Sequence, residues 1–331
     1  MITALLAIDI GGSTSRATLI DRNGNCLGLG RNRGGNPGSN PPAEAAAAVV
    51  AAAESAVGQA GEPIDIKVAM LAMAGVRNAD ALRLMEEGFR RQGLTGPMVM
   101  TGDTHAMLPS VSAAKDGYCI FCGTGSGAVK IRNDEVETVA DAAGYLIGDL
   151  GSGFWLGHHA AIAVCSELDG RGPTTALTPA ILGSLGIDAT RDVAFDGRPT
   201  PLRHFIDAVY AMRPIELARF APQVIANRED PIAAALLTQS EAFLLADFRK
   251  IFDPEVQGPV VLGGSVAAHL KGLPAEIAKV LEAAGHQPDI RLAGDGAIGA
   301  AVLALRHEGI TVDEAMLQHI TASMAAKAAK A

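Results

Sequence analysis

An acidic residue and a glycine-rich turn close the first apolar run of the chain. The run ends at Asp9, and Gly11, Gly12, Ser13 and Thr14 precede a second alternating run. This pattern predicts a β-hairpin whose turn exposes backbone N–H groups and short hydroxyls to an anion, because glycine has no Cβ. Asp9 is placed to hold a hydrated Mg²⁺ ion, which keeps much of its water shell. Phosphate and Mg²⁺ together indicate nucleotide chemistry. An ordinary glycine-rich hairpin is the alternative for this segment alone.

Three further segments end an apolar run in the same way. Residues 97–107 predict a strand that delivers Asp103 to the start of a helix, and residues 117–126 predict a second hairpin. Residues 259–265 predict a strand followed by a glycine turn. The two later turns contain Gly123, Thr124, Gly125, Ser126, Gly263, Gly264 and Ser265. Four such signals in this order are far more specific than any one of them.

Together these segments resemble the sugar kinases of the actin/hexokinase/Hsp70 ATPase superfamily. Within it the chain is similar to the N-acetylglucosamine kinase and BadF/BadG/BcrA/BcrD group, from Ala4 to about Leu305. The motifs that carry the resemblance are D-I-G-G-S-T (9–14), T-G-D-T-H-A (101–106), F-C-G-T-G-S (121–126), G-Y-L-I-G-D-L-G-S-G-F-W-L-G (144–157) and L-G-G-S (262–265). The resemblance implies an ATP- and Mg²⁺-dependent kinase. Its expected substrate is a hydroxyl of N-acetylglucosamine or a related hexosamine.

Phosphoryl transfer defines the roles that these residues would take. An acceptor hydroxyl must lose its proton, and the charge of the γ-phosphate must be offset. Asp103 is the candidate general base, and a helix N-cap is the alternative for this residue. The turn at 11–14 would cradle the β- and γ-phosphates, and the turn at 123–126 would close on them from the other domain. Gly263 and Gly264 would approach the ribose or the α-phosphate, unless they form a plain strand-to-helix turn.

The sugar side is expected in two loops. In the family an asparagine of the polar, glycine-rich segment 31–40 reaches the sugar, and Asn36 is the best match; a flexible hairpin tip is the alternative. In the second loop, Gly144 and Tyr145 would lie beside the sugar ring, and Asp149 matches the aspartate that bonds sugar hydroxyls. Leu150 departs from the usual glutamate, which removes a hydrogen-bond acceptor. This departure favours an N-acylated or uncharged sugar, with a glucosamine kinase as the alternative.

Hydrophobic periodicity predicts an internal duplication. Two β-β-β-α-β-α-β-α units imply two mixed sheets with a cleft between them. With the resemblance, this is an α/β fold of two duplicated RNase H-like (actin-like ATPase) domains. The expected first domain is 1–114, joined by a C-terminal helix at about 309–331, and the second is 115–308 with a helical insertion at about 168–258. Helices are expected at 104–114 and 265–284, directly after Asp103 and the last glycine turn.

Composition agrees with a cytoplasmic enzyme but does not identify one, and the small-molecule sugar substrate is what the resemblance implies. The net charge of −9 and an aromatic content of 4% argue against a nucleic-acid partner. No apolar stretch approaches the ~20 residues of a membrane span, and no signal segment opens the chain. Four cysteines in 331 residues do not form a disulfide framework. A homodimer is compatible with these features.

A BadF-type ATPase that activates a partner enzyme is the main alternative to a kinase. Some relatives of that type hold an iron–sulfur cluster through bridging cysteines. Cys119 and Cys122 lie three residues apart in an apolar strand, so their side chains are expected to point to opposite faces and to be buried. A sensor without turnover is a third alternative, against which Asp9 and Asp103 both argue.

Overall fold

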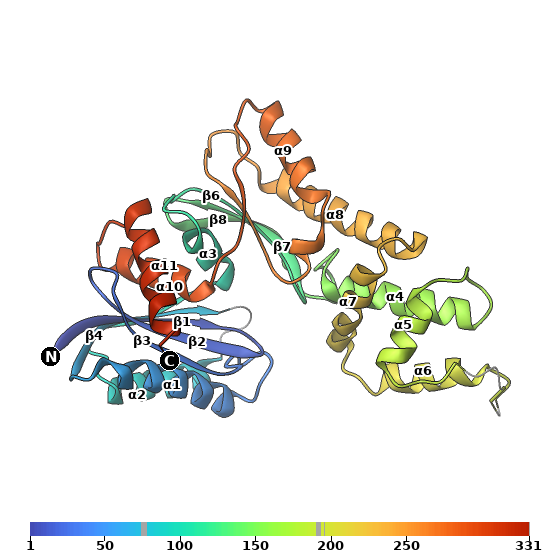
Figure 1. Cartoon of the computed structure of the whole chain (residues 1–331), viewed down its shortest axis with the longest axis horizontal. Helices are drawn as coiled ribbons and strands as arrows, with labels where there is room; N and C mark the ends of the chain where they lie inside the picture. Colours follow the sequence, from blue (N-terminus) through green and yellow to red (C-terminus); the bar gives the residue numbers. More distant parts are fainter. Residues whose placement is uncertain (74–77, 190–192, 195, 331) are drawn as a thin grey trace.

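Two five-stranded sheets form the framework of the protein (Figure 1). The computed structural model describes residues 1–73, 78–189, 193–194 and 196–330. The strands of the first sheet are β1 (Ile2–Ile10), β2 (Thr14–Asp21), β3 (Cys26–Arg33), β4 (Ile64–Met73) and β5 (Met98–Thr101). Those of the second are β6 (Gly117–Cys122), β7 (Ser126–Arg132), β8 (Glu135–Asp141), β9 (Val260–Gly263) and β10 (Ile290–Leu292).

The two sheets repeat one topology. In the first, β1, β2 and β3 form an antiparallel meander, and β4 and β5 join β1 in parallel, in the order β3-β2-β1-β4-β5. In the second, β6, β7 and β8 form the meander, and β9 and β10 join β6 in parallel. The predicted duplication of an RNase H-like, actin-like ATPase domain is therefore confirmed.

Helices cover both faces of the first sheet. Successive residues of β1 point to opposite faces, so Leu6 and Ile8 pack with α1 (Pro42–Val57) and α2 (Ala79–Arg91). Leu5 and Ala7 face α10 (Gly296–His307) and α11 (Glu314–Ala328) on the other side (Figure 1). The expected return of the last helix to the first domain is thus observed.

The boundary expected at residue 308 does not agree with this packing. α10 had been expected to belong to the second domain, but its buried side chains pack on β1 and β4 of the first sheet. The chain crosses from the second sheet to the first between β10 and α10, one helix earlier than expected. Residue 331 of the expected C-terminal segment, and residues 190–192 and 195 of the expected insertion, lie outside the described residues.

The second sheet carries the insertion on one face. Its largest core joins β6 and β9 to the helices α4–α9. These are α4 (Gly153–Leu168), α5 (Leu177–Ser184), α6 (Thr200–Tyr210), α7 (Ala221–Ala226), α8 (Pro231–Ile251) and α9 (Leu273–Ala283). A smaller core with Cys119, Val129 and Leu108 covers the opposite face, next to α3 (Asp103–Met107). Cys119 and Cys122 are buried in different cores, as the sequence predicts.

Two helices are shorter than expected. The helix expected at 104–114 is α3, followed by a single 3₁₀ turn at Leu108–Ser110. The helix expected at 265–284 is a 3₁₀ turn at Ala267–His269, and α9 begins only at Leu273. Leu270 leaves the helical conformation with a ψ of 81°, and Pro274 lies in the first turn of α9, where its missing N–H has no intrahelical partner to lose.

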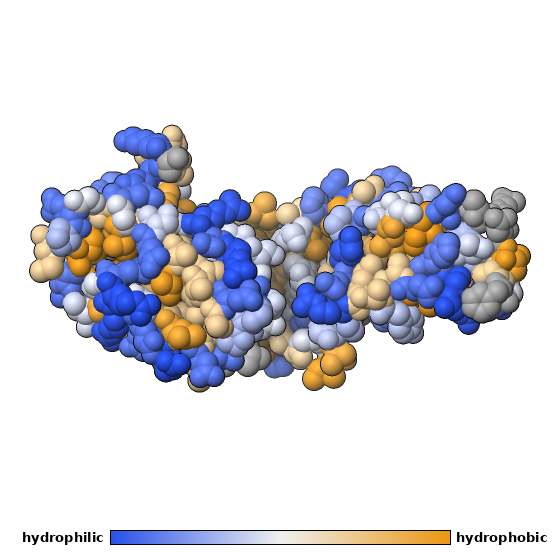
Figure 2. All heavy atoms as spheres, turned by 90° about the horizontal axis from the view of Figure 1, so that it is seen from below, coloured by the Kyte–Doolittle hydropathy of each residue, from blue (hydrophilic) through white to orange (hydrophobic). Residues whose placement is uncertain are grey.

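The outer surface is mixed in polarity. The space-filling view shows an elongated molecule that narrows between its two ends, with polar residues over much of this face (Figure 2). Among the described residues, no helix combines the length and the apolar character that crossing a bilayer would require.

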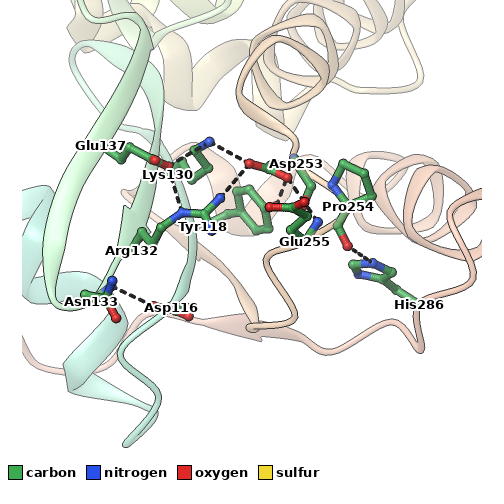
Figure 3. A network of polar contacts seen from close by, with 10 residues as sticks. All are labelled: Asp116, Tyr118, Lys130, Arg132, Asn133, Glu137, Asp253, Pro254, Glu255 and His286. Carbon is green, nitrogen blue, oxygen red and sulfur yellow. Dashed lines mark hydrogen bonds and ion pairs between the residues drawn. The ribbon is translucent and has the colours of Figure 1, made fainter.

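A polar network fixes the end of α8 to the second sheet (Figure 3). Lys130 and Arg132 of β7 contact the carboxylate of Asp253 at 3.1 and 2.6 Å, and both also contact Glu137 of β8. The buried Tyr118 of β6 donates its hydroxyl proton to the Asp253 carbonyl at 2.7 Å and accepts from the Asp253 N–H at 3.0 Å. Two strands, β6 and β7, therefore contact one acidic residue that follows α8, and β8 joins the network through Glu137.

Replacing Tyr118 with phenylalanine tests this network without emptying the core. We expect Tyr118→Phe to lower the free energy of unfolding by about 1–2 kcal/mol, because the ring stays and two backbone contacts of its hydroxyl are lost. Urea denaturation of both proteins measures this difference. Tyr210→Phe is the control, since Tyr210 is 85% exposed. Equal free energies of unfolding for the two variants would contradict a stabilising contribution of the Tyr118 hydroxyl to the network.

Candidate active site

The first glycine turn joins β1 to β2. The N–H of Gly11 donates to the carbonyl of Thr14 at 2.9 Å, which closes the turn. Asp9 and Arg16 are direct cross-strand partners on either side of it. The Asp9 carboxylate is 16% exposed and accepts from the Arg16 guanidinium at 2.7 Å. Burial raises the pKa of Asp9, and the charge of Arg16 opposes this effect.

The expected sugar loop of the first domain packs directly on this turn. Asn36 is 7% exposed, and its N–H donates to the Gly11 carbonyl at 3.3 Å. Its side-chain oxygen accepts from the N–H of Gly38 at 2.8 Å, and the Asn40 amide donates to the Gly12 carbonyl at 3.3 Å. Through these hydrogen bonds the segment around Asn36 packs against the glycine turn, and the Asn36 side chain is buried. A flexible hairpin tip, the alternative for Asn36, does not describe it.

Asp103 is the first residue of α3, directly after the end of β5. The helix N-cap is Gly102, so the alternative role of Asp103 as an N-cap is wrong. The carboxylate accepts from the N–H of Thr104 at 2.8 Å. Burial is the main cause that raises the pKa of Asp103, and the negative charge of Asp9 raises it further. The two carboxylates are therefore electrostatic neighbours at one edge of the first sheet.

Sequence reasoning missed a third carboxylate at this edge. Asp295 is the N-cap of α10, where its side chain accepts from the N–H of Ala297 at 2.9 Å. It also contacts Arg16 at 3.3 Å. A Cβ on the next residue, Gly296, would lie 2.8 Å from the carboxyl carbon of Asp9. The segment G-D-G-A-I-G-A after β10 was the available signal, because it places an acid between two glycines at a helix start.

The acidic edge suits a hydrated Mg²⁺ ion. Asp9, Asp103 and Asp295 supply oxygen ligands only, and the tight space at Gly296 brings α10 against Asp9. Within the described ranges no group of three or more His, Cys, Asp or Glu side chains could hold a metal ion unaided. Mg²⁺ is commonly held by one or two carboxylates together with water and phosphate oxygens, so the residues present fit this ion.

The second glycine turn lies at the start of α4. The N–H of Gly123 donates to the Gly125 carbonyl at 2.9 Å, and the N–H groups of Gly153 and Phe154 donate to Gly123 and Thr124 at 2.7 and 3.1 Å. Gly264 closes the turn from the β9 side. It has a φ of +96°, and a Cβ there would overlap the Cys122 carbonyl. Only glycine therefore allows the 123–126 and 263–265 turns to lie together.

These two turns open on an apolar pocket of about 340 Å³. Gly123, Thr124 and Ser265 form its polar end. Its apolar wall comes from the insertion and includes Ala218, Ala221, Pro222, Ile225 and Ala226. Gly263 does not line this pocket, because it is buried against Met107 and Ala293.

Asp141 and Asp149 hold the second expected sugar loop. Asp141 accepts from the N–H groups of Asp149 and Leu150, both at 2.8 Å. Asp149 is 9% exposed, accepts from the N–H of Gly144 at 3.3 Å, and would lie 2.6 Å from a Cβ on Gly125. Burial raises the pKa of Asp149. Its carboxylate therefore links this loop to the second glycine turn.

The side chains of this loop are more open than its backbone. The Tyr145 ring packs 4.9 Å from the ring of Phe154, at the first turn of α4. The Leu150 side chain is 42% exposed, while its carbonyl accepts from the Ser126 hydroxyl at 2.9 Å. The structure thus groups Gly144, Tyr145 and Asp149 with Gly125 and Ser126. Asn36 and Asp103 form a second group with Asp9 and the turn at 11–14.

The chain matches one known protein family over most of its length. The model of the BadF/BadG/BcrA/BcrD ATPase family matches residues 6–304. The chain belongs to this family. The matched range includes both glycine turns, the two loops expected to bind the sugar, and the three carboxylates.

The chain is also similar to individual sugar kinases. It is 29% identical over 121 residues to the N-acetylmuramic acid/N-acetylglucosamine kinase of Clostridium acetobutylicum, covering 36% of this chain and 39% of that protein. It is 25% identical over 202 residues to the N-acetyl-D-glucosamine kinase of Dictyostelium discoideum, covering 57% of this chain and 59% of that protein. The matched stretches thus span less than two thirds of these relatives.

A solved structure extends the similarity to nearly the whole chain. A proposed N-acetylglucosamine kinase from Chromobacterium violaceum superimposes with a TM-score of 0.72 and 27% identity, covering 92% of this chain and 99% of that one. The two-domain architecture is therefore shared over its full extent.

Gly296→Ala tests the acidic edge. The added Cβ would meet the Asp9 carboxylate, which Arg16 also holds, so the carboxylate must move. We expect the affinity for ADP in the presence of Mg²⁺ to fall by about tenfold, as for the loss of one charged contact. Isothermal titration calorimetry measures it. Gly183→Ala is the control, because a Cβ there meets nothing within 4 Å. An unchanged affinity in Gly296→Ala would argue against a site at this edge.

Proposed function

We propose that the protein is an ATP-dependent kinase that phosphorylates a hydroxyl of an amino sugar, N-acetylglucosamine or a related hexosamine. The observation that carries the proposal is the position of Asp103. It is a half-buried carboxylate at the start of α3, after the end of β5, and the charge of Asp9 acts on it. Membership in a family of ATPases and similarity to sugar kinases support the same activity.

Asp103 is the proposed general base. Burial favours its neutral form and raises its pKa, which makes the carboxylate a stronger proton acceptor than an exposed aspartate. It would take the proton of the sugar hydroxyl as that hydroxyl attacks the terminal phosphate of ATP. Asp9 would hold Mg²⁺, most of whose ligands are water and phosphate oxygens, and the ion would offset phosphate charge.

The glycine turns are the proposed phosphate sites. Gly12 and Ser13 offer backbone N–H groups from the first domain, together with the hydroxyls of Ser13 and Thr14, and Thr124 and Gly125 offer theirs from the second. The N–H groups of Gly11 and Gly123 and the hydroxyl of the buried Ser126 instead donate to carbonyls within the protein. The apolar pocket beside Thr124 and Ser265 would take the adenosine. Its wall comes from the insertion, which would explain why an otherwise duplicated domain carries extra helices here.

Five residues are proposed to contact the sugar. They are Asn36, Asp103, Gly144, Tyr145 and Asp149. The Tyr145 ring offers an apolar face next to α4. Leu150 supplies an exposed apolar side chain where a carboxylate would attract an ammonium group. This chemistry favours an N-acyl sugar over free glucosamine, which is cationic near neutral pH.

An activator that shares an iron–sulfur cluster between subunits is the second candidate. Its cysteines would have to be accessible and to act as thiolates. Burial raises the pKa of Cys119 and of Cys122 to about 12, and the two side chains lie in different cores. Neither thiol suits a bridging cluster, and the kinase remains the better supported function.

Asp103→Asn tests the catalytic assignment. Removing the base should lower kcat by at least about 100-fold, while the affinity for ADP stays close to that of the wild type. Release of ADP is measured with N-acetylglucosamine, glucosamine, N-acetylmannosamine, glucose and muropeptide-type sugars. Asp207→Asn, an exposed aspartate of α6, is the control. A variant that keeps more than a tenth of wild-type kcat would remove Asp103 from the base role.

Leu150→Glu tests the proposed preference for an uncharged sugar. A carboxylate at this position should raise the ratio of kcat/KM for glucosamine to that for N-acetylglucosamine by about tenfold, through attraction of the ammonium group. Initial rates with both sugars give the ratio. Leu146→Glu is the control on the same loop, since Leu146 is 81% exposed. The proposal fails if wild type already prefers glucosamine, or if both variants change the ratio equally.

A further inference from the structure

A single arginine binds two of the carboxylates at the acidic edge. One terminal nitrogen of Arg16 lies 2.7 Å from Asp9 and the other lies 3.3 Å from Asp295. Arg16 is on β2, directly opposite Asp9 on β1, whereas Asp295 lies almost 300 residues later, at the start of α10. The guanidinium therefore joins the first glycine turn to the last crossing of the chain.

This contact places a cation where a metal ion would need the same carboxylate. The planar guanidinium has a donor directed at Asp9, and its positive charge repels any divalent ion that approaches that oxygen. A metal that uses Asp9 must either move Arg16 or accept a weakened carboxylate. Arg16 can move, because its side chain is 44% exposed, whereas that of Asp9 is only 16% exposed.

We propose that Arg16 is the resident counter-ion of the metal site. It pairs with Asp9 and Asp295 in this structure, and it leaves Asp9 for Asp295 when a divalent cation binds with the nucleotide. Arg16 is thus a positioning residue that sets the affinity for the metal. The inference rests on the proposed function, because it takes Asp9 as the metal anchor.

Asp295 is suited to retain the arginine. Its carboxylate is already oriented as the N-cap of α10 by the N–H of Ala297, so it stays in place when Arg16 turns away from Asp9. It also follows the crossing between β10 and α10. There the N–H of Gly294 donates to the Ser110 hydroxyl at 3.0 Å, and Arg291 donates to the Val111 carbonyl at 2.7 Å. Both chain connections between the domains therefore meet next to Asp295.

The test compares nucleotide affinity with and without metal. The dissociation constant of ADP is measured by calorimetry in Mg²⁺ and in EDTA. The value in EDTA divided by the value in Mg²⁺ is the metal ratio, which reports how much the metal contributes to ADP binding. In Arg16→Gln the metal no longer competes with a guanidinium, so we expect the ratio to rise by roughly threefold or more. Arg22→Gln is the matched control, because Arg22 follows the same strand and pairs with Glu308 at 3.5 Å. Its ratio should equal that of the wild type.

A purely structural role for Arg16 would weaken ADP binding equally in both conditions and leave the ratio unchanged. An unchanged or smaller ratio in Arg16→Gln therefore overturns the inference. If that variant does not fold, Arg16→Lys replaces it. Lysine keeps the charge but lacks the fork that reaches two carboxylates at once, so an increased ratio is again expected and an unchanged one overturns the inference.

Asp9→Asn separates this inference from the proposed function. If Asp9 anchors the metal, the metal ratio of the Asp9→Asn variant falls towards one. A fall in Asp9→Asn with no change in Arg16→Gln overturns only the role of Arg16. An unchanged ratio in both variants also removes Asp9 as the metal anchor, whereas sugar-dependent release of ADP by the wild type tests the kinase activity independently.

Discussion

Electrostatic repulsion between two half-buried carboxylates is the constraint on which the site depends. Asp9 lies near the end of β1, Asp103 begins α3 after β5, and the charge of Asp9 raises the pKa of Asp103. Two such groups cannot both be ionised away from water without compensation. Arg16 compensates Asp9, and the N–H of Thr104 compensates Asp103. The parallel order β1-β4-β5 brings these groups to one edge of the sheet, so the topology creates the electrostatic problem that the neighbouring residues then solve.

The second domain has different contacts at its own glycine turn, which follows β6 as the first turn follows β1. It also carries two neighbouring carboxylates, Asp141 and Asp149, but both accept from backbone N–H groups of their own loop. Asp149 lies under Gly125, and the start of α4 donates two N–H groups to the turn. The apolar pocket beside this turn is walled by the insertion. The first domain therefore contributes the carboxylates at its strand ends, and the second contributes an apolar pocket beside its glycine turn. This division suits the proposed reaction between a phosphate and a neutral hydroxyl.

Local sequence predicts the strands, the glycine turns and Asp103, because each is encoded within a few residues. It does not predict what lies across the fold. The position of α10 on the first sheet depends on its packing against β1, some 290 residues earlier. Arg16 and Asp295 appear as ordinary charged residues until the crossing after β10 brings them together. The burial of Asn36 likewise depends on contacts of its segment with the turn at Gly11 and Gly12, which local sequence does not reveal.

The loop at residues 141–150 shows how specificity can vary while the site is preserved. Its backbone is fixed by Asp141, which binds two successive N–H groups, and by Ser126, which binds the Leu150 carbonyl. None of these contacts uses the side chain of residue 150. That side chain is 42% exposed beside a loop that would keep its position with another residue there. Under the proposed function, exchange of an acid for leucine would change the chemistry presented to the sugar without moving Asp149 or the second glycine turn, so residue 150 is the position at which we expect substrate preference to diverge.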